Sequence, residues 1–287
     1  MRRRRLVGVS DPVDLPAVID APVPFAKGHG TENDFVILPD LTGRLEVSAD
    51  QVRAVCDRRA GIGGDGIIRI APDPAGGYFM DHRNSDGSLA QMCGNGARLF
   101  VRYLVDNDLV EAGQVEFGTR AGRRSAEVLP DGRVRLGMGA VTIGPESASS
   151  VAGVSFPGVA VDVGNPHLVA FIEVPVDTLN LLDQPQFDEA VFADGVNLEY
   201  VNVLGPGEVR MRVHERGVGE TRSCGTGTVA VAAAHLRRQG AVSGTVLVHV
   251  PGGTIEVGVE GGTGTITGPA VVVGSGGIDP AWWNAHR

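Results

Sequence analysis

The chain has 287 residues, of which 43% are hydrophobic and 21% charged, so it is long enough for two ordinary domains with a buried core. Its formal net charge of −9 argues against nucleic acid or an anionic membrane as the main partner. No apolar run approaches the ~18 to 20 residues of a membrane-spanning helix. The three cysteines, an odd number, argue against a disulfide-bonded secreted protein and predict a cytoplasmic one.

The N-terminal segment is basic from Met1 to Arg5 and then becomes polar and acidic. Its apolar stretch, residues 6–9, is too short for the hydrophobic region of a signal peptide. We therefore expect residues 1–22 to form a disordered tail.

Two of the cysteines stand in matching local sequences. Cys93 begins the sequence Cys-Gly-Asn-Gly-Ala, and Cys224 begins Cys-Gly-Thr-Gly-Thr. Each is followed by an apolar stretch with helical character, at residues 97–105 and 229–236. The match predicts two helices that each start directly after a cysteine.

The same spacing continues upstream of both cysteines. Asn84 lies nine residues before Cys93, and Glu215 lies nine residues before Cys224. Two more pairs stand at matching distances, namely Asn33 with Asn165 and Gly66 with Asn197. The sequence thus contains an internal repeat of about 130 residues, which indicates two similar domains with one such cysteine each.

Short β-rich segments surround the two predicted helices, for example residues 134–138, 159–163 and 245–250. The 42 glycines are spread along the chain, as many tight turns between short strands require. We expect an α+β fold of two pseudo-symmetric lobes, residues 23–140 and 141–268, with the active site in the cleft between them.

A cysteine at the start of a helix has two chemical uses. The free N–H groups of the first turn form an anion site, here at Gly94, Asn95, Gly225 and Thr226. The positive end of the helix also stabilises a thiolate. A lone cysteine of this kind is more often a small buried residue, which is our interpretation of Cys56.

A thiol and a thiolate on opposite sides of one carbon can invert a stereocentre. One removes the proton from one face, and the other delivers a proton to the opposite face. The carbanion formed in between needs fixed dipoles on its carboxylate, which two facing helix starts would supply. The paired cysteines therefore predict an amino-acid epimerase or racemase that needs neither a metal nor an organic cofactor.

Four segments in order resemble those of the diaminopimelate epimerase family. They are Lys-Gly-His-Gly-Thr-Glu-Asn-Asp-Phe at 27–35, Asp-Gly-Ser-Leu-Ala-Gln-Met-Cys-Gly-Asn-Gly-Ala-Arg at 86–98, Gly-Asn-Pro-His at 164–167, and Glu-Arg-Gly-Val-Gly-Glu-Thr-Arg-Ser-Cys-Gly-Thr-Gly at 215–227. The resemblance implies an isomerase that converts LL- to meso-diaminopimelate without pyridoxal phosphate or metal, in lysine and peptidoglycan-precursor synthesis. It also implies a homodimer, and two lobes that each wrap a strongly curved antiparallel sheet or barrel around a central helix. A C-terminal strand, at about residues 269–287, would return to the first lobe.

The resemblance also implies roles for individual residues. Cys93 and Cys224 correspond to the acid/base pair, assisted by His167 and Glu215. The substrate-binding positions are Asn33, Asn84, Asn165, Asn197 and Arg216, with Glu215 and the helix-start residues Gly94, Asn95, Gly225 and Thr226. Many family members carry Gln where this chain has Gly66.

Three alternatives remain open from the sequence. The first is a two-thiol racemase of the proline or hydroxyproline type, and the second is an isomerase of the same fold that uses a carboxylate and has lost the thiols. The third is a non-catalytic binding protein for amino acids or cell-wall precursors. If the two sulfurs flank one carbon, we also expect oxidation to cross-link Cys93 to Cys224 and to inactivate the enzyme reversibly.

Overall fold

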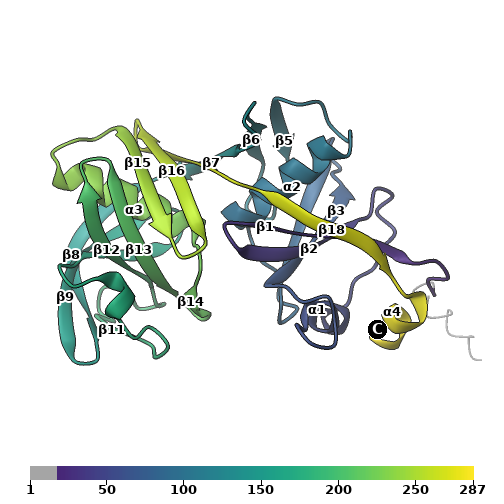
Figure 1. Cartoon of the computed structure of the whole chain (residues 1–287), viewed down its shortest axis with the longest axis horizontal. Helices are drawn as coiled ribbons and strands as arrows, with labels where there is room; N and C mark the ends of the chain where they lie inside the picture. Colours follow the sequence, from purple (N-terminus) through teal and green to yellow (C-terminus); the bar gives the residue numbers. More distant parts are fainter. Residues whose placement is uncertain (1–17) are drawn as a thin grey trace, which may run out of the picture.

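The computed structural model describes residues 18–287, which fold into two lobes side by side (Figure 1). Most of the expected disordered tail, residues 1–17, lies outside the described residues. Its last part is held in place, because Ile19 exchanges two backbone hydrogen bonds with the Asn284 side chain, at 3.3 and 2.8 Å. The contact with the C-terminal end of the chain is what orders this short stretch.

The first lobe is built mainly from the N-terminal half of the chain. Its elements are β1 (Val23–Gly30), β2 (Asn33–Pro39), α1 (Ala49–Cys56), β3 (Gly66–Pro72), β4 (Tyr78–Asn84), α2 (Gly94–Asp106), β5 (Gln114–Phe117), β6 (Arg124–Val128) and β7 (Val134–Ala140). Helix α2 is the central element, and strands from β1 to β7 pack around it.

The second lobe repeats this plan around α3 (Gly225–Arg238). Its other elements are β8 (Thr142–Val151), β9 (Val154–Asp162), β10 (Pro166–Phe171), a short 3-10 helix (Val176–Thr178), β11 (Gln186–Phe187), β12 (Asn197–Gly205), β13 (Glu208–Glu215), β14 (Gly219–Thr221), β15 (Gly244–Val250), β16 (Gly253–Glu260) and β17 (Thr263–Gly268). Alternating burial along strands such as β15 and β16 turns one face of the sheet toward the helix.

Each lobe contains a pair of parallel strands at the equivalent place. Strand β2 pairs in parallel with β3, with Phe35 opposite Gly66. Strand β10 pairs in parallel with β12, with His167 opposite Asn197. These positions match the spacing of the sequence repeat, and the predicted α+β fold of two similar lobes is confirmed.

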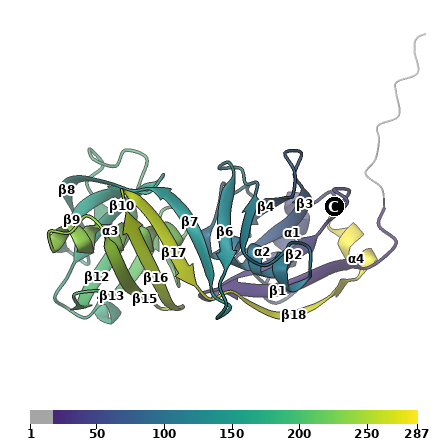
Figure 2. The same ribbon diagram turned by 90° about the horizontal axis from the view of Figure 1, so that it is seen from above.

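The sheets do not close into barrels. One sheet has the order β18-β1-β2-β3-β4, in which β18 is the strand Val271–Ile278, and the other sheet runs from β11 and β8 in the second lobe to β5 in the first. The two lobes share this second sheet, because β17 pairs with β7. Figure 2 shows β17 and β7 side by side at the junction of the lobes. Since the sheet passes from one lobe to the next, neither lobe can complete a barrel of its own.

The last strand, β18 (Val271–Ile278), pairs antiparallel with β1 along the first lobe. Helix α4 (Pro280–Ala285) follows it and buries Trp283 beside α1 residues, with Gln51 donating to the Trp283 carbonyl at 3.1 Å. We propose that the first lobe comprises residues 23–140 with the returning segment 269–287, and that the second comprises residues 141–268.

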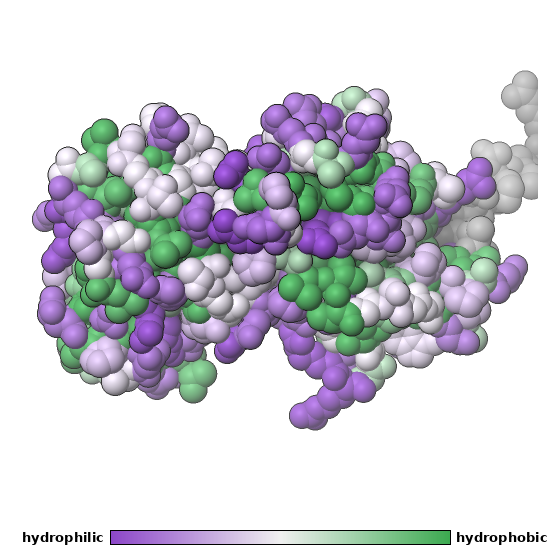
Figure 3. Space-filling view, turned by 45° about the horizontal axis from the view of Figure 1, so that its top comes forward, coloured by the Kyte–Doolittle hydropathy of each residue, from purple (hydrophilic) through white to green (hydrophobic). Residues whose placement is uncertain are grey.

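Both central helices are mostly buried, and their exposed residues lie in the last turns. A single core cluster includes Leu99 and Phe100 of α2 together with Val229 and Val231 of α3. Hydrophilic and hydrophobic residues are interspersed over both lobes in the view of Figure 3, and the molecule narrows between them. Within residues 18–287, no helix has the length and apolar character needed to cross a membrane.

Candidate active site

The two central helices begin next to each other at the junction of the lobes. Cys93 is the N-cap of α2 and Cys224 the N-cap of α3, and both have extended backbone conformations, as N-caps require. A methyl group at Gly225 would be in van der Waals contact with the Cα of Gly94, at 3.4 Å. The two positive helix ends therefore lie next to each other at one small volume.

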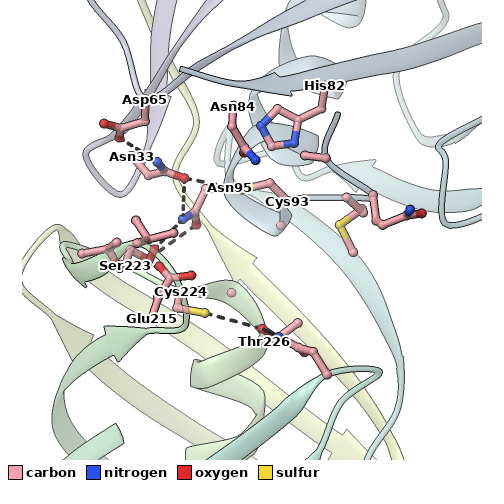
Figure 4. A pocket seen from close by; sticks show the side chains of 18 of the residues that line it. Asn33, Asp65, His82, Asn84, Cys93, Asn95, Glu215, Ser223, Cys224 and Thr226 are labelled. Atoms are coloured by element: carbon pink, nitrogen blue, oxygen red, sulfur yellow. Dashed lines mark hydrogen bonds between the residues drawn. The ribbon is translucent and has the colours of Figure 1, made fainter. Parts of the chain in front are cut away.

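A cavity of about 740 Å³ lies at this junction, a size typical of small-molecule sites. Figure 4 shows Cys93 and Cys224 on its two sides, each at the start of its helix. Most of the predicted site residues line the cavity, namely Asn33, Asn84, Cys93, Gly94, Asn95, Asn165, Glu215, Arg216, Cys224, Gly225 and Thr226. Positions far apart in the sequence are thus brought together as the repeat predicts.

Asn33 lies beside Cys93 and is held in one orientation. Its amide nitrogen donates to Asp65 at 2.7 Å, so its oxygen faces the site. That oxygen accepts from the Cys93 thiol at 3.4 Å and from the Asn95 amide at 3.1 Å. Asn33 therefore presents an acceptor, which suits an ammonium group.

Asn165 lies beside Cys224 with the opposite polarity. Its oxygen is 3.1 Å from Nε2 of His167, and its amide nitrogen donates to the Thr226 hydroxyl at 3.4 Å. The Thr226 hydroxyl is in turn 3.5 Å from the Cys224 sulfur. Asn165, the counterpart of Asn33 in the repeat, thus turns its N–H donor toward the cavity where Asn33 turns an acceptor, and this suits a carboxylate.

The two thiols differ in their electrostatic surroundings. Burial raises the pKa of the Cys93 thiol and the charge of Glu215 adds to that rise, while the Gly96 N–H and the Arg98 guanidinium oppose it. Burial raises the pKa of Cys224 well above its usual value, and the negative charges of Glu215 and Glu199 raise it further. The Glu199 carboxylate therefore acts on Cys224, and the Arg98 guanidinium acts on Cys93.

Glu215 and Arg216 follow each other at the end of β13. Burial raises the pKa of the Glu215 carboxyl, which accepts a hydrogen bond from Thr221. The Arg216 guanidinium is exposed in the cavity wall and forms no ion pair with any of residues 18–287; it donates only to the Asp194 carbonyl at 3.0 Å. It is available for a carboxylate of a ligand.

Two predicted site residues lie behind the cavity wall. Asn197 donates to the Pro166 carbonyl at 3.0 Å and accepts from the Arg216 backbone N–H at 3.0 Å, so its amide holds the backbone that carries Arg216. His167 is fully buried under the Cys224 helix start. Neither residue lines the cavity.

Gly66 is explained by a close approach of backbone. A methyl group there would lie 2.4 Å from the Arg83 carbonyl oxygen and 3.4 Å from Nε2 of His82. No side chain fits at this position without moving β4. His82, which lines the cavity, occupies the space in front of Gly66.

Sequence reasoning missed several residues that organise the site. Ser223 and Thr31 join the lobes through their hydroxyls at 3.1 Å, and Asn95 donates to the Ser223 carbonyl at 3.0 Å. Arg98 is fully buried and donates to Thr31 and Asn95, at 2.9 Å each. The sequence predicts Asn95 and Cys224, which lie next to these residues. The hydrogen bonds that Thr31 makes with Arg98 and Ser223 form only in the folded protein, between segments distant in the sequence.

No group of three or more His, Cys, Asp and Glu side chains within residues 18–287 is placed to hold a metal ion. The cavity wall contains basic and acidic groups in balance. Its lining residues include Arg58, Arg124, Arg216 and Arg222 together with Glu32, Asp65, Glu215 and Glu220. Such a lining fits a zwitterionic ligand.

A model of the diaminopimelate epimerase family matches residues 25–144 and 159–273. The chain belongs to this family. Its epimerase relatives include diaminopimelate epimerase of Rhodococcus erythropolis, which is 47% identical over 92% of this chain and 99% of its own. Diaminopimelate epimerase of Mycolicibacterium smegmatis is 46% identical over 91% and 98%.

Solved structures of low identity share the fold. The Bacillus anthracis phenazine biosynthesis protein of the PhzF family superposes with a TM-score of 0.68 at 14% identity, covering 90% of this chain and 99% of that one. A hydroxyproline epimerase from Agrobacterium vitis superposes with a TM-score of 0.63 at 16% identity, covering 91% and 94%. The two-lobed architecture of this diaminopimelate epimerase family member therefore extends well beyond the family.

Proposed function

We propose that the protein interconverts LL- and meso-2,6-diaminopimelate, with Cys93 and Cys224 as its acid and base. The observation that carries the proposal is the placement of the two cysteines. Each is the N-cap of one central helix, and both line one cavity. Membership of the diaminopimelate epimerase family indicates diaminopimelate as the substrate.

In the proposed reaction, the carboxylate at the reacting end lies between the two helix starts. A thiolate removes the α-proton, and the electron pair of the C–H bond moves into the carboxylate. The N–H groups of both first turns stabilise the added negative charge. The opposite thiol then gives its proton to the other face of the carbon, which leaves the second sulfur as thiolate and the first as thiol.

The distal end of the substrate needs its own recognition. Arg216 is free to grip the distal carboxylate with two parallel hydrogen bonds. Asn84 stands in the cavity wall with its amide donating to Ser88 at 3.0 Å, which leaves its oxygen open to an ammonium group. A proline-type substrate has no distal carboxylate, so Arg216 favours diaminopimelate over the racemase alternative.

The test is proton exchange at the α-carbon. In deuterium oxide, with reductant and no added cofactor, LL-diaminopimelate should lose its α-proton signal at one end while meso product appears. Cys93→Ala and Cys224→Ala should each lower the rate by at least about 100-fold, since each removes an acid/base group.

Two other outcomes would contradict the proposal. Exchange of proline or hydroxyproline without exchange of diaminopimelate would move the chain to the other thiol racemases. Binding of diaminopimelate without any exchange would indicate that the chain is a non-catalytic binding protein.

We further propose that this activity serves lysine and peptidoglycan-precursor synthesis in the cytoplasm, and that the protein is a homodimer. A closed two-fold dimer is the commonest assembly of a soluble enzyme. Light scattering on the purified protein tests this, and a mass of 29.9 kDa would contradict it.

A further inference from the structure

The layer directly beneath the two helix starts differs between the lobes. In the first lobe it contains Phe35 and Ile68, two residues beyond Asn33 and Gly66 along the parallel pair. At the equivalent places in the second lobe stand His167 and Glu199, two residues beyond Asn165 and Asn197. One lobe therefore packs two apolar side chains where the other has two ionisable ones.

The packing confirms that these positions are equivalent. A methyl group at Gly96 of α2 would lie 3.1 Å from Ile68 and 3.4 Å from Phe35. A methyl group at Gly227 of α3 would lie 2.7 Å from Oε1 of Glu199 and 3.4 Å from the Cys224 sulfur. The Glu199 carboxylate thus sits under the Cys224 helix start as Ile68 sits under that of Cys93.

This arrangement costs stability. His167 and Glu199 are both fully buried, and Nδ1 of His167 is 2.6 Å from Oε1 of Glu199. The other carboxylate oxygen, Oε2, has no hydrogen-bond partner among the described residues. Apolar residues of similar volume, as in the first lobe, are often as stable as a buried ion pair or more so. Stability alone therefore does not explain the His167–Glu199 pair, which points to a function for it.

Both ring nitrogens of His167 face oxygen atoms. Nδ1 faces the Glu199 carboxylate, and Nε2 faces the amide oxygen of Asn165 at 3.1 Å. The Asn165 amide nitrogen donates to Thr226, which turns the amide oxygen toward Nε2. With Glu199 as a carboxylate, both ring nitrogens then meet acceptors, and an imidazolium satisfies both of them. From there the chain of contacts continues through the Asn165 amide and the Thr226 hydroxyl to the Cys224 sulfur.

We propose that Glu199 is a positioning residue that holds His167 as an imidazolium of fixed orientation, and so orders Asn165 and Thr226 beside Cys224. It touches no substrate, because it has no exposed surface and does not line the cavity. The first lobe has no counterpart, so the effect applies to Cys224 alone. The catalytic consequence rests on the proposed epimerase function, whereas the state of His167 does not.

The kinetic test compares a neutral isostere with a shorter carboxylate. Glu199→Gln keeps the size of the side chain but removes its charge, and it should lower kcat by about 10-fold or more with a much smaller change in KM. Glu199→Asp keeps the charge and should retain more activity than Glu199→Gln. If packing alone mattered, the order of the two variants would be reversed.

A matched control exists in the same lobe. Glu208 and His249 form a second His–Glu pair at 2.7 Å, which is partly exposed and does not belong to the cavity lining. Glu208→Gln should leave kcat unchanged. An equal loss in Glu208→Gln and Glu199→Gln would overturn the proposal.

The protonation of His167 is measured directly by two-bond ¹H–¹⁵N spectra of histidine-labelled protein, with His167→Gln to assign its signals among seven histidines. The wild type should show both ring nitrogens protonated, and Glu199→Gln should show one unprotonated nitrogen at the same pH. A neutral His167 in the wild type would overturn the proposal. This readout needs no turnover, so an imidazolium in a protein without epimerase activity would contradict only the proposed function.

Discussion

Arg98 is a full positive charge in the protein interior without a carboxylate partner among the described residues. Its acceptors are neutral oxygens, those of Thr31 and Asn95 at 2.9 Å and the Pro269 carbonyl at 3.4 Å. Burial lowers its pKa to about 10, which still leaves it charged at neutral pH. Arg98 follows Cys93 by five residues, and the equivalent residue after Cys224 is Val229. The charge therefore favours the Cys93 thiolate only.

His82 makes the stability of the first lobe sensitive to mild acid. Burial, together with the charge of Arg120, lowers its pKa to about 4 from an ordinary value of 6.5. In the unfolded chain the imidazole binds its proton near pH 6.5, so between about 6.5 and about 4 the unfolded state holds more protons than the folded one. The free energy of unfolding should fall by up to about 3 kcal/mol as the pH drops through this window.

Urea unfolding at a series of pH values checks this expectation. His82→Leu should flatten the pH dependence between pH 6.5 and 4, because the titrating group is gone. The matched control is Met80→Leu, a change in the same buried strand that removes no titratable group and should leave the slope as it is. An unchanged slope in His82→Leu would contradict the assignment.

The sequence predicts the residues of the site better than their contacts. Cys93 and Asn33 are found because type and spacing repeat along the chain, whereas Arg216 is found only through the resemblance to the family. Arg98 and Glu199 are missed, although Arg98 lies three residues after Asn95 and Glu199 two residues after Asn197. Their importance comes from burial and from side chains of other elements, which no local pattern encodes.

At the scale of elements, both central helices begin in the same way, with a cysteine N-cap. The strands beneath them differ in the side chains that they carry. The same parallel pair carries an apolar layer in one lobe and an ionic layer in the other. The asymmetry sits in β10 and β12, one layer away from the reacting groups. Two pseudo-symmetric halves thus provide two thiols with different properties.

Exchanging this layer separates stability from catalysis. The double variant His167→Phe/Glu199→Ile gives the second lobe the side chains of the first. It should fold with the wild-type free energy of unfolding or up to about 4 kcal/mol more, because a buried ion pair is replaced by apolar contacts. Its epimerisation rate should fall at least as far as that of Glu199→Gln.

Urea unfolding and the exchange assay measure the two effects on the same sample. The single variant Glu199→Ile is the control, since it leaves Nδ1 of His167 buried and unpaired and should lose about 1 to 3 kcal/mol. A double variant that is fully active would show that the ionic layer has no part in catalysis.

At the scale of the whole molecule, oxidation should lock the two lobes together. An oxidant such as diamide takes two electrons and two protons from the Cys93 and Cys224 thiols and leaves a disulfide between them. We expect epimerase activity to be lost and to return with dithiothreitol, because the reaction requires one thiol and one thiolate. Cys56 should stay reduced, since burial raises the pKa of its thiol to about 12.

Peptide mapping by mass spectrometry identifies the cross-link, and activity is measured on the same samples. The variant Cys56→Ala should respond to diamide as the wild type does. Full activity in protein whose two site thiols are shown to be oxidised would refute the expectation.

The repeat predicts the two-lobed α+β architecture but not how the sheets are shared. Alternation of apolar residues indicates strands, yet it does not say which strands pair across the lobe boundary. The contact of β17 with β7 joins residues more than a hundred positions apart, and it is this pairing that keeps the sheets from closing into barrels. Long-range pairing of this kind is set by the packed core rather than by local sequence.

The return of β18 to β1 also determines the order in which the molecule can be assembled. During synthesis, β1 leaves the ribosome long before the strand that covers its edge, whereas residues 141–268 of the second lobe emerge as one uninterrupted stretch. Pairing between distant segments is slow to form and leaves strand edges open in the meantime. The first lobe is therefore synthesised first but completed last. The edge of β1 stays open to aggregation until β18 has been synthesised.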